Sequence, residues 1–115
     1  MKCLLPALLL IMAITSCSDQ AVDYYNRGNA EKAGGDLNSA ERDYHRAVQI
    51  DPNYAEAHNS FGAVILQKGR LDEAILHFQK ALQIKPDYKD ALVNLGLALV
   101  QKGKVDEAIT SSNKH

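Results

Sequence analysis

The sequence predicts an all-α protein built from stacked helix pairs. Two observations lead to this prediction. Marker residues recur with a period of 34 positions, and each period holds two segments whose apolar residues follow helical spacing. A fixed period of this length indicates one supersecondary unit stacked on copies of itself, because a single helix pair cannot bury its own apolar face.

Small residues and prolines mark the repeat. The positions in register are Gly28, Gly62 and Gly96; Gly35, Gly69 and Gly103; Ala40, Ala74 and Ala108; Pro52 and Pro86; and Tyr54 and Tyr88. A longer stretch also returns, since Gln67-Lys68-Gly69 reappears as Gln101-Lys102-Gly103 and Asp72-Glu73-Ala74-Ile75 as Asp106-Glu107-Ala108-Ile109. The chain therefore holds about three units, the last of them incomplete.

The middle unit predicts one helix over about 55–68 and a second over about 72–84. Gly69 lies where the first helix has to stop, because glycine adopts a left-handed conformation at little cost. Asp72 is expected to cap the second helix with its side chain, as Asn38 and Asp106 would in the neighbouring units. Pro52 and Pro86 end the second helices, because proline cannot continue the hydrogen-bond ladder.

Packing within a unit is predicted to depend on its small residues. Gly62 and Ala74 let the two backbones approach each other, while Phe61, Phe78 and Ala81 fill the space beside them. A glycine inside a helix costs about 1 kcal/mol relative to alanine, so its return in three units indicates a packing role.

These residues resemble the tetratricopeptide repeat family. The middle unit carries the family pattern as His58, Phe61, Gly62, Ile65, Ala74, Phe78, Ala81 and Pro86. The third unit departs from it, since Ser112 stands in place of the aromatic residue. The resemblance implies a right-handed α-solenoid whose concave groove receives peptides.

The N-terminal region differs from the repeats and predicts export. Residues 1–16 have a basic start, an apolar middle and small residues at the end, as in a signal peptide, and the apolar run is shorter than the roughly 20 residues of a membrane span. Ile14-Thr15-Ser16-Cys17 resembles the lipobox of bacterial lipoproteins, which implies lipid on Cys17. The alternative is an ordinary secretory signal followed by an incidental cysteine.

The domain boundaries follow from these two regions: a signal peptide over 1–16, a lipidated N-terminus and tether over 17–20, and a repeat domain over 21–115 with units 21–54, 55–88 and 89–115. The lipoprotein resemblance implies an anchor on the periplasmic side of a bacterial membrane, and Ser18 favours the outer membrane. Because the tether spans little more than about 10 Å, the first repeat is expected close to the lipid surface.

The third unit lacks the polar capping helix that normally ends a repeat stack. Its predicted helix over 90–101 is apolar on nearly every side. Either the chain is a truncated fragment, or a partner or a second copy covers this surface.

Nothing in the sequence points to catalysis, a metal or a cofactor. The four histidines lack the spacing of metal ligands, and the glycines follow the repeat period rather than a phosphate-binding pattern. A formal net charge of −1 gives no basic excess for nucleic acid. The chain is therefore expected to be a non-enzymatic binding protein.

The predicted binding surface is the outer face of the first helix of each unit. Its residues are Tyr25, Asn29, Asn59, Ala63, Leu66, Gln67, Val93, Leu97 and Gln101. Amide side chains beside an apolar stripe suit an extended peptide. Members of the tetratricopeptide repeat family can grip a peptide C-terminus with a carboxylate clamp, and this clamp is missing here. Its positions hold Tyr25, Asn29, Ser60, Asp90 and Asn94, of which only Asn29 is the residue that the family's clamp has.

Three functions remain open at this point. The first is a membrane-anchored adaptor or scaffold that binds a partner protein or peptide in the groove. The second is a substrate-recruiting arm of a larger enzyme such as a glycosyltransferase, whose catalytic part this chain lacks. The third is a structural subunit that self-associates through the uncapped third repeat.

Overall fold

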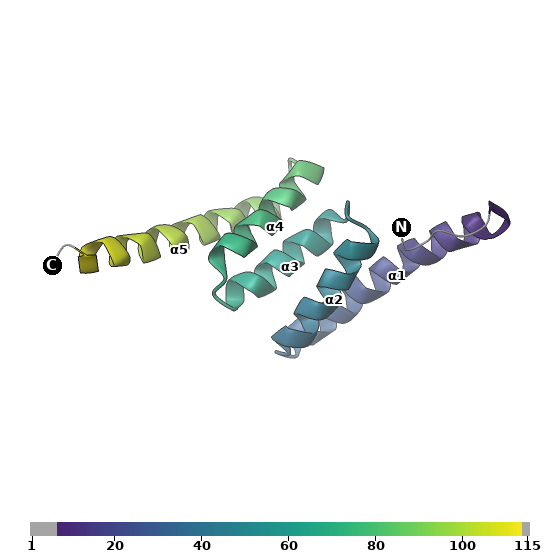
Figure 1. The fold of residues 1–115 in the computed structure, drawn as a ribbon, viewed down its shortest axis with the longest axis horizontal. Helices are drawn as coiled ribbons and strands as arrows, with labels where there is room; N and C mark the ends of the chain where they lie inside the picture. Colours follow the sequence, from purple (N-terminus) through teal and green to yellow (C-terminus); the bar gives the residue numbers. More distant parts are fainter. Residues whose placement is uncertain (1–6, 114–115) are drawn as a thin grey trace.

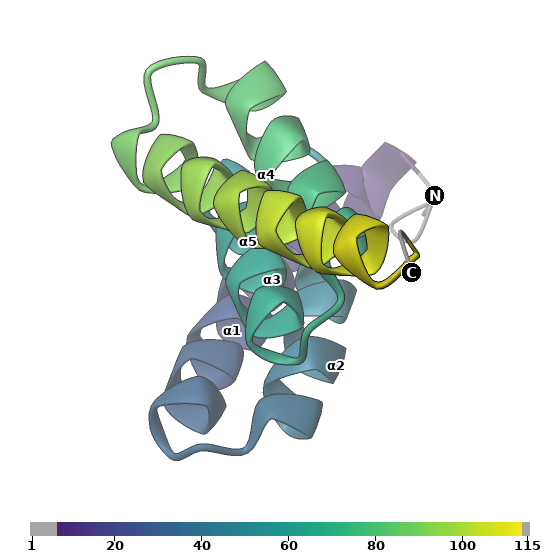
Figure 2. The ribbon, with the colours of Figure 1, turned by 90° about the vertical axis from the view of Figure 1, so that its left-hand side faces the viewer.

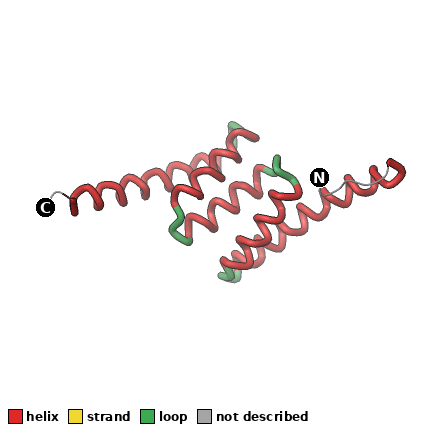
Figure 3. The backbone as a smooth tube through the Cα atoms, viewed as in Figure 1, coloured by secondary structure: helices red, strands yellow, loops and turns green. Residues whose placement is uncertain are grey.

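The structure is a computed structural model that describes the backbone of residues 7–113 and the side chains of residues 19–109. It consists of five helices: α1 (Ala7–Ala33), α2 (Leu37–Ile50), α3 (Ala55–Gln67), α4 (Leu71–Ile84) and α5 (Lys89–Asn113). Short turns join them, and no strand occurs in the described part of the chain (Figures 1 and 3). The predicted all-α fold is confirmed.

The helices form two antiparallel pairs followed by one long helix. α1 packs against α2 and α3 against α4, and α5 stacks on α4 while also touching α3 (Figure 2). α3 also touches α1, so the first helices of the units share one side of the stack. This is the arrangement of an α-solenoid, as the 34-residue period predicts.

The turn inside each pair depends on a glycine in the left-handed region. Gly35 has φ +87° and Gly69 has φ +84°. After α3, the Gly69 N–H donates to the Leu66 carbonyl at 2.9 Å and the Arg70 N–H donates to the Ile65 carbonyl at 3.1 Å. These two bonds satisfy carbonyls at the end of α3, so the predicted stop at Gly69 is confirmed.

The predicted helix caps were wrong by two residues. Asp36 caps α2, with its carboxylate accepting from the Ser39 N–H at 3.1 Å. Arg70 begins α4 without a side-chain cap bond, and Asp72 already lies in the first helical turn. The chain leaves the glycine turn directly into the helix, which places the cap immediately after the glycine.

Asn38 and Asp72 instead link neighbouring units. Asn38 Oδ1 accepts from Lys68 Nζ at 2.6 Å, and Asp72 Oδ1 pairs with Lys102 Nζ at 2.9 Å. The two contacts are equivalent under the 34-residue period. Each joins the start of a second helix to a lysine of the following unit, which is Lys68 at the C-terminal end of α3 in one case and Lys102 inside α5 in the other.

The third unit also differs from the prediction. Instead of a helix, a turn at Gly103 and a second helix, α5 continues without a break through Gly103, and its C-terminal half extends away from the stack (Figure 1). Asp106 therefore lies inside a helix and caps nothing. A Cβ built on Gly96 meets no atom within 4 Å. Without an aromatic ring at position 112, nothing packs against this glycine to hold a hairpin together.

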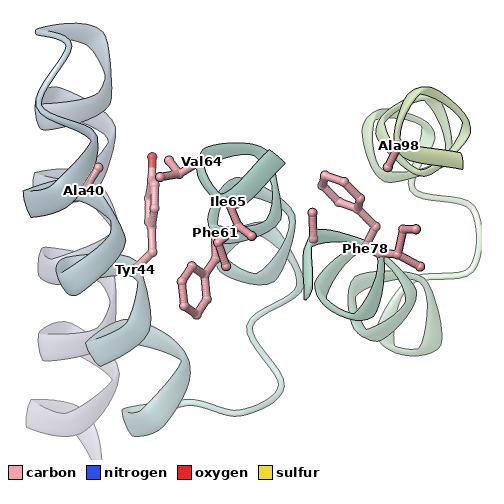
Figure 4. Close-up of a cluster of buried hydrophobic side chains, with 9 residues drawn as sticks. Ala40, Tyr44, Phe61, Val64, Ile65, Phe78 and Ala98 are labelled. Carbon is pink, nitrogen blue, oxygen red and sulfur yellow. The ribbon is translucent and has the colours of Figure 1, made fainter. Parts of the chain in front are cut away.

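The core confirms that small residues set the packing distance. A Cβ on Gly28 would lie 2.7 Å from the Tyr44 ring, and one on Gly62 would lie 2.6 Å from the Phe78 ring. Tyr44 and Phe78 are fully buried. In Figure 4 the Phe78 ring points from α4 toward Ala98 of α5, so one aromatic side chain joins two units.

The predicted signal peptide, lipid site and tether lie in the N-terminal part of the chain, where the structure describes the backbone from residue 7 and side chains only from residue 19. α1 begins at Ala7 and runs through the positions predicted to form the end of the signal peptide, the lipid site and the tether. Residues 1–6 lie outside the described residues. Among the helices described, none has the length and apolar character needed to cross a membrane.

Candidate functional site: a hollow along the first helices

A hollow of about 370 Å³ lies along α1, α3 and α5. It is lined by Tyr25, Lys32, Asn59, Ser60, Ala63, Tyr88, Asp90, Val93 and Asn94. Four of the predicted groove residues therefore meet here: Tyr25, Asn59, Ala63 and Val93. The period of 34 residues brings them together, because equivalent positions on successive first helices face the same side.

Two amide side chains form the floor of the hollow. Asn94 Nδ2 of α5 donates to Asn59 Oδ1 of α3 at 3.0 Å. Asn59 is only 7% exposed, which makes it a structural link between two units as much as a binding residue. A side-chain amide has more donors and acceptors than this one bond uses, so the pair retains hydrogen-bonding capacity for a peptide backbone.

Tyrosine rings surround the α1 end of the hollow. The Tyr25 ring lies 5.0 Å from the Tyr54 ring and 6.0 Å from the Tyr44 ring, measured between centroids. Burial raises the pKa of Tyr54 and of Tyr88, and it raises the pKa of Tyr44 to about 12. All three hydroxyls are therefore neutral near pH 7 and can both donate and accept.

Asn29 has a structural partner. The Tyr44 hydroxyl donates to Asn29 Oδ1 at 2.5 Å and thereby ties α1 to α2. Of the other predicted groove residues, Leu66 is half-buried against the core, while Gln67, Leu97 and Gln101 are exposed outside the lining of the hollow. The predicted groove is thus shorter than the sequence suggests.

Tyr88 was missed as a site residue. It immediately precedes α5, and the sequence marks it only as the repeat of Tyr54. That shared position was the signal that could have revealed it. Both tyrosines stand just before a first helix, where the chain enters the face that lines the hollow.

The charges at the hollow are mixed. Lys32 comes from α1 and Asp90 from the first turn of α5. Asp90 occupies one of the positions of the family's carboxylate clamp. A fixed negative charge there repels the free carboxylate of a peptide C-terminus.

A second hollow of about 500 Å³ lies between α2 and α4, and its lining is Asn38, Glu41, Arg42, His45, Phe61, Glu73 and His77. Its carboxylates are already paired. Glu41 binds Lys68 at 2.7 Å and Arg70 at 2.9 Å, and the bond from Arg70 is the main reason that its pKa falls to about 2. Because these charged groups already pair with one another and hold two units together, they are not free to bind a ligand. The hollow along the first helices is therefore the better candidate site.

His58 and His77 are packing residues. His58 is 7% exposed, and its Nε2 lies 2.9 Å from the Pro52 carbonyl oxygen. The His77 ring lies 4.2 Å from the Phe61 ring. Among the described residues, no three His, Cys, Asp or Glu side chains gather closely enough to hold a metal ion.

Comparison with known proteins agrees with this geometry. A family model described as TPR repeat matches residues 28–69 and again residues 62–103. The chain belongs to the tetratricopeptide repeat family. This fold is that of a protein-interaction module, and no curated protein matches the chain significantly.

Solved structures show the same fold. Two crystal structures of MamA superimpose with a TM-score of 0.71 at 31% identity, covering 85% and 89% of this chain. The chain spans about three fifths of MamA, 61% and 60% in the two structures. The second tetratricopeptide domain of Spaghetti (RPAP3), bound to the HSP90 peptide SRMEEVD, superimposes with a TM-score of 0.73 at 24% identity, covering 84% of this chain and 89% of that domain.

Proposed function

We propose that this protein is a membrane-anchored adaptor that binds an extended segment of a partner protein in the hollow along α1, α3 and α5. The observation that carries the proposal is the Asn59–Asn94 amide pair, set between tyrosine rings and the exposed side chain of Val93. Amides suit the main chain of an extended peptide, and the apolar and aromatic groups suit its side chains.

The proposed ligand is an internal segment rather than a chain end. The Spaghetti domain was solved with a short acidic peptide, SRMEEVD. In this protein, Asp90 and Asn94 stand at positions of the family's carboxylate clamp, and Asp90 opposes a terminal carboxylate. An acidic C-terminal tail is therefore a poor ligand for this hollow.

The proposed anchor is lipid on Cys17, on the periplasmic side of a bacterial membrane, with the outer membrane favoured by Ser18. The motif Ile14-Thr15-Ser16-Cys17 supports this proposal. Several acyl chains on one residue give stable attachment, whereas one chain gives only marginal binding. Metabolic labelling with a fatty-acid analogue should label the protein, and Cys17→Ala should abolish the label while Cys3→Ala leaves it.

Selection from a random peptide library on the full chain tests the binding function. Peptides with both ends blocked should be selected, and Val93→Glu should weaken their binding at least tenfold. The matched control is Leu76→Glu, because Leu76 is 65% exposed on α4 and outside the hollow. Ligands that require a free C-terminus, or binding unaffected by Val93→Glu, would contradict the proposal.

A further inference from the structure

The hollow along α1, α3 and α5 is lined by one basic and one acidic side chain, Lys32 of α1 and Asp90 of α5. Within the described part of the chain, α1 and α5 each contact α3 but do not contact each other. Lys32 and Asp90 therefore come to the hollow from helices on either side of α3. A segment bound across the hollow meets a positive charge on one side and a negative charge on the other.

These two charges are available to a ligand. Among the described residues, no ion pair involves Lys32 or Asp90. By contrast, Glu56 of α3 is paired with Lys85 at 2.9 Å. Asp90 is exposed and Lys32 is half-buried. A ligand with charges of only one sign is repelled by one of the two groups, whereas a ligand with both signs is attracted by both.

An aromatic ring adds to the attraction for a cation on the α5 side. Tyr88 lines the hollow two residues before Asp90. Its ring already attracts one ammonium group, since Lys85 Nζ lies 4.8 Å from the ring centroid, and Glu56 neutralises that lysine. Burial raises the pKa of Tyr88, so the ring carries no charge near pH 7. A neutral ring beside a carboxylate favours the side chain of lysine or arginine.

The same side of the hollow offers exposed apolar surface. Val93, Leu97 and Val100 lie at i, i+4 and i+7 on α5 and therefore share one face, and they are 62%, 51% and 56% exposed. Their equivalents one repeat earlier on α3 are Asn59, Ala63 and Leu66, which are polar, small or half-buried. Val93 lines the hollow one helical turn after Asp90. An aliphatic side chain of the ligand thus belongs beside its basic side chain.

We propose that the partner segment bound in this hollow is a mixed-charge one. Its basic side chain pairs with Asp90, an aliphatic side chain beside it packs on Val93, and an acidic side chain pairs with Lys32. This inference rests on the proposed binding function and names the chemistry of its ligand. It also assigns Lys32 and Asp90 as the residues that determine specificity, while the Asn59–Asn94 amide pair holds the main chain of any segment.

Selection from a random library of end-blocked peptides, repeated on charge-reversed variants of the full chain, tests the inference. The wild type should enrich peptides that carry a basic and an acidic residue in one short segment. With Asp90→Lys the enriched basic residue should give way to an acidic one, and with Lys32→Glu the enriched acidic residue should give way to a basic one. Asp106→Lys and Lys104→Glu are the matched controls, because these exposed residues of α5 lie outside the hollow, and they should leave the wild-type preference unchanged.

The affinity of one selected peptide gives a second readout. Asp90→Lys should weaken its binding by about tenfold or more, because like charges then meet. Replacing the basic residue of the peptide by glutamate should restore binding to this variant. Circular dichroism should show that the variants remain helical.

Two outcomes contradict the inference in different ways. Enrichment without regard to charge, or the wild-type preference retained by Asp90→Lys and Lys32→Glu, would overturn it while leaving the binding function intact. A wild-type chain that selects no peptide at all would overturn the binding function and this inference together.

Discussion

Gly62 of α3 lies directly against the ring of Phe78 of α4, so closely that a Cβ on Gly62 would come within 2.6 Å of Phe78 Cε1. The ring cannot move aside, because Phe78 is fully buried between α3 and α5. This contact sets the distance between the two helices of the middle unit. Gly28 and Tyr44 repeat it in the first unit.

Gly62→Ala should therefore destabilise the fold by about 2 kcal/mol, the usual cost of overpacking a core. Gly96→Ala is the matched control, because a Cβ there meets no atom within 4 Å. It should instead stabilise the protein by up to about 1 kcal/mol through helix propensity. Urea unfolding measures both, and equal effects at the two sites would contradict the packing role.

Gly69→Ala and Gly103→Ala should also have opposite effects. Gly69 has φ +84°, where alanine costs roughly 1–2 kcal/mol. Gly103 lies inside α5, where alanine should stabilise the helix by about 1 kcal/mol. Thermal unfolding distinguishes the two, and destabilisation by Gly103→Ala would show that the third unit forms a hairpin with a turn at that glycine.

Tyr44→Phe should destabilise the protein by about 1 kcal/mol, because it removes the hydroxyl that donates to Asn29 and leaves the ring in place. Tyr24→Phe is the control, since Tyr24 is only partly buried and its ring faces Arg27 and Arg46. Urea unfolding of the two variants gives the comparison. A loss for Tyr24→Phe as large as for Tyr44→Phe would argue against the Asn29 bond as the cause.

Stability should fall in mild acid because of His77. Burial, followed by the neighbouring His58, lowers the pKa of His77 from 6.5 to about 4. The unfolded state therefore binds more protons than the folded state between these two pH values. The contribution of neutral His77 to the free energy of unfolding is complete above pH 6.5 and is lost as the pH falls to about 4. A shift of this size corresponds to about 3 kcal/mol, and solvent screening of the partly exposed ring reduces the expected loss to roughly 2 kcal/mol.

The charged and titratable groups acting on His77 are His58, Glu73, His45 and Arg70. His77→Phe keeps a ring against Phe61 and removes the titration, so it should flatten the dependence of unfolding free energy on pH between 6.5 and 4. Parallel curves for the wild type and the variant would assign the acid sensitivity to other groups.

The sequence predicts the repeat units well because their determinants are local and periodic. Gly69 ends a helix by its own backbone preference, and the pairing of Gly62 with Phe78 follows from the family pattern. The caps were harder to predict: Asp36 and Asn38 are both acceptable capping residues for α2, and only the geometry after the glycine turn decides between such positions.

The candidate site was predicted less completely, since its details depend on contacts between helices. Asn59 was expected as an open groove residue, but its bond to Asn94 places it at 7% exposure. Asn29 is engaged by a tyrosine from the next helix. Neither contact can be read from the apolar pattern of a single helix. The continuous helix through Gly103 likewise reflects the missing aromatic residue and could not be seen from the matching Gln-Lys-Gly segments.

The central claim is that the hollow along α1, α3 and α5 binds a partner, and photo-cross-linking in intact cells tests it most directly. The reactive residue should replace Val93, which is 62% exposed and lines the hollow, with Leu76 on α4 as the control position. We expect one discrete partner captured from position 93 and none from position 76. Capture of the same proteins from both positions, or of none from either, would contradict the account.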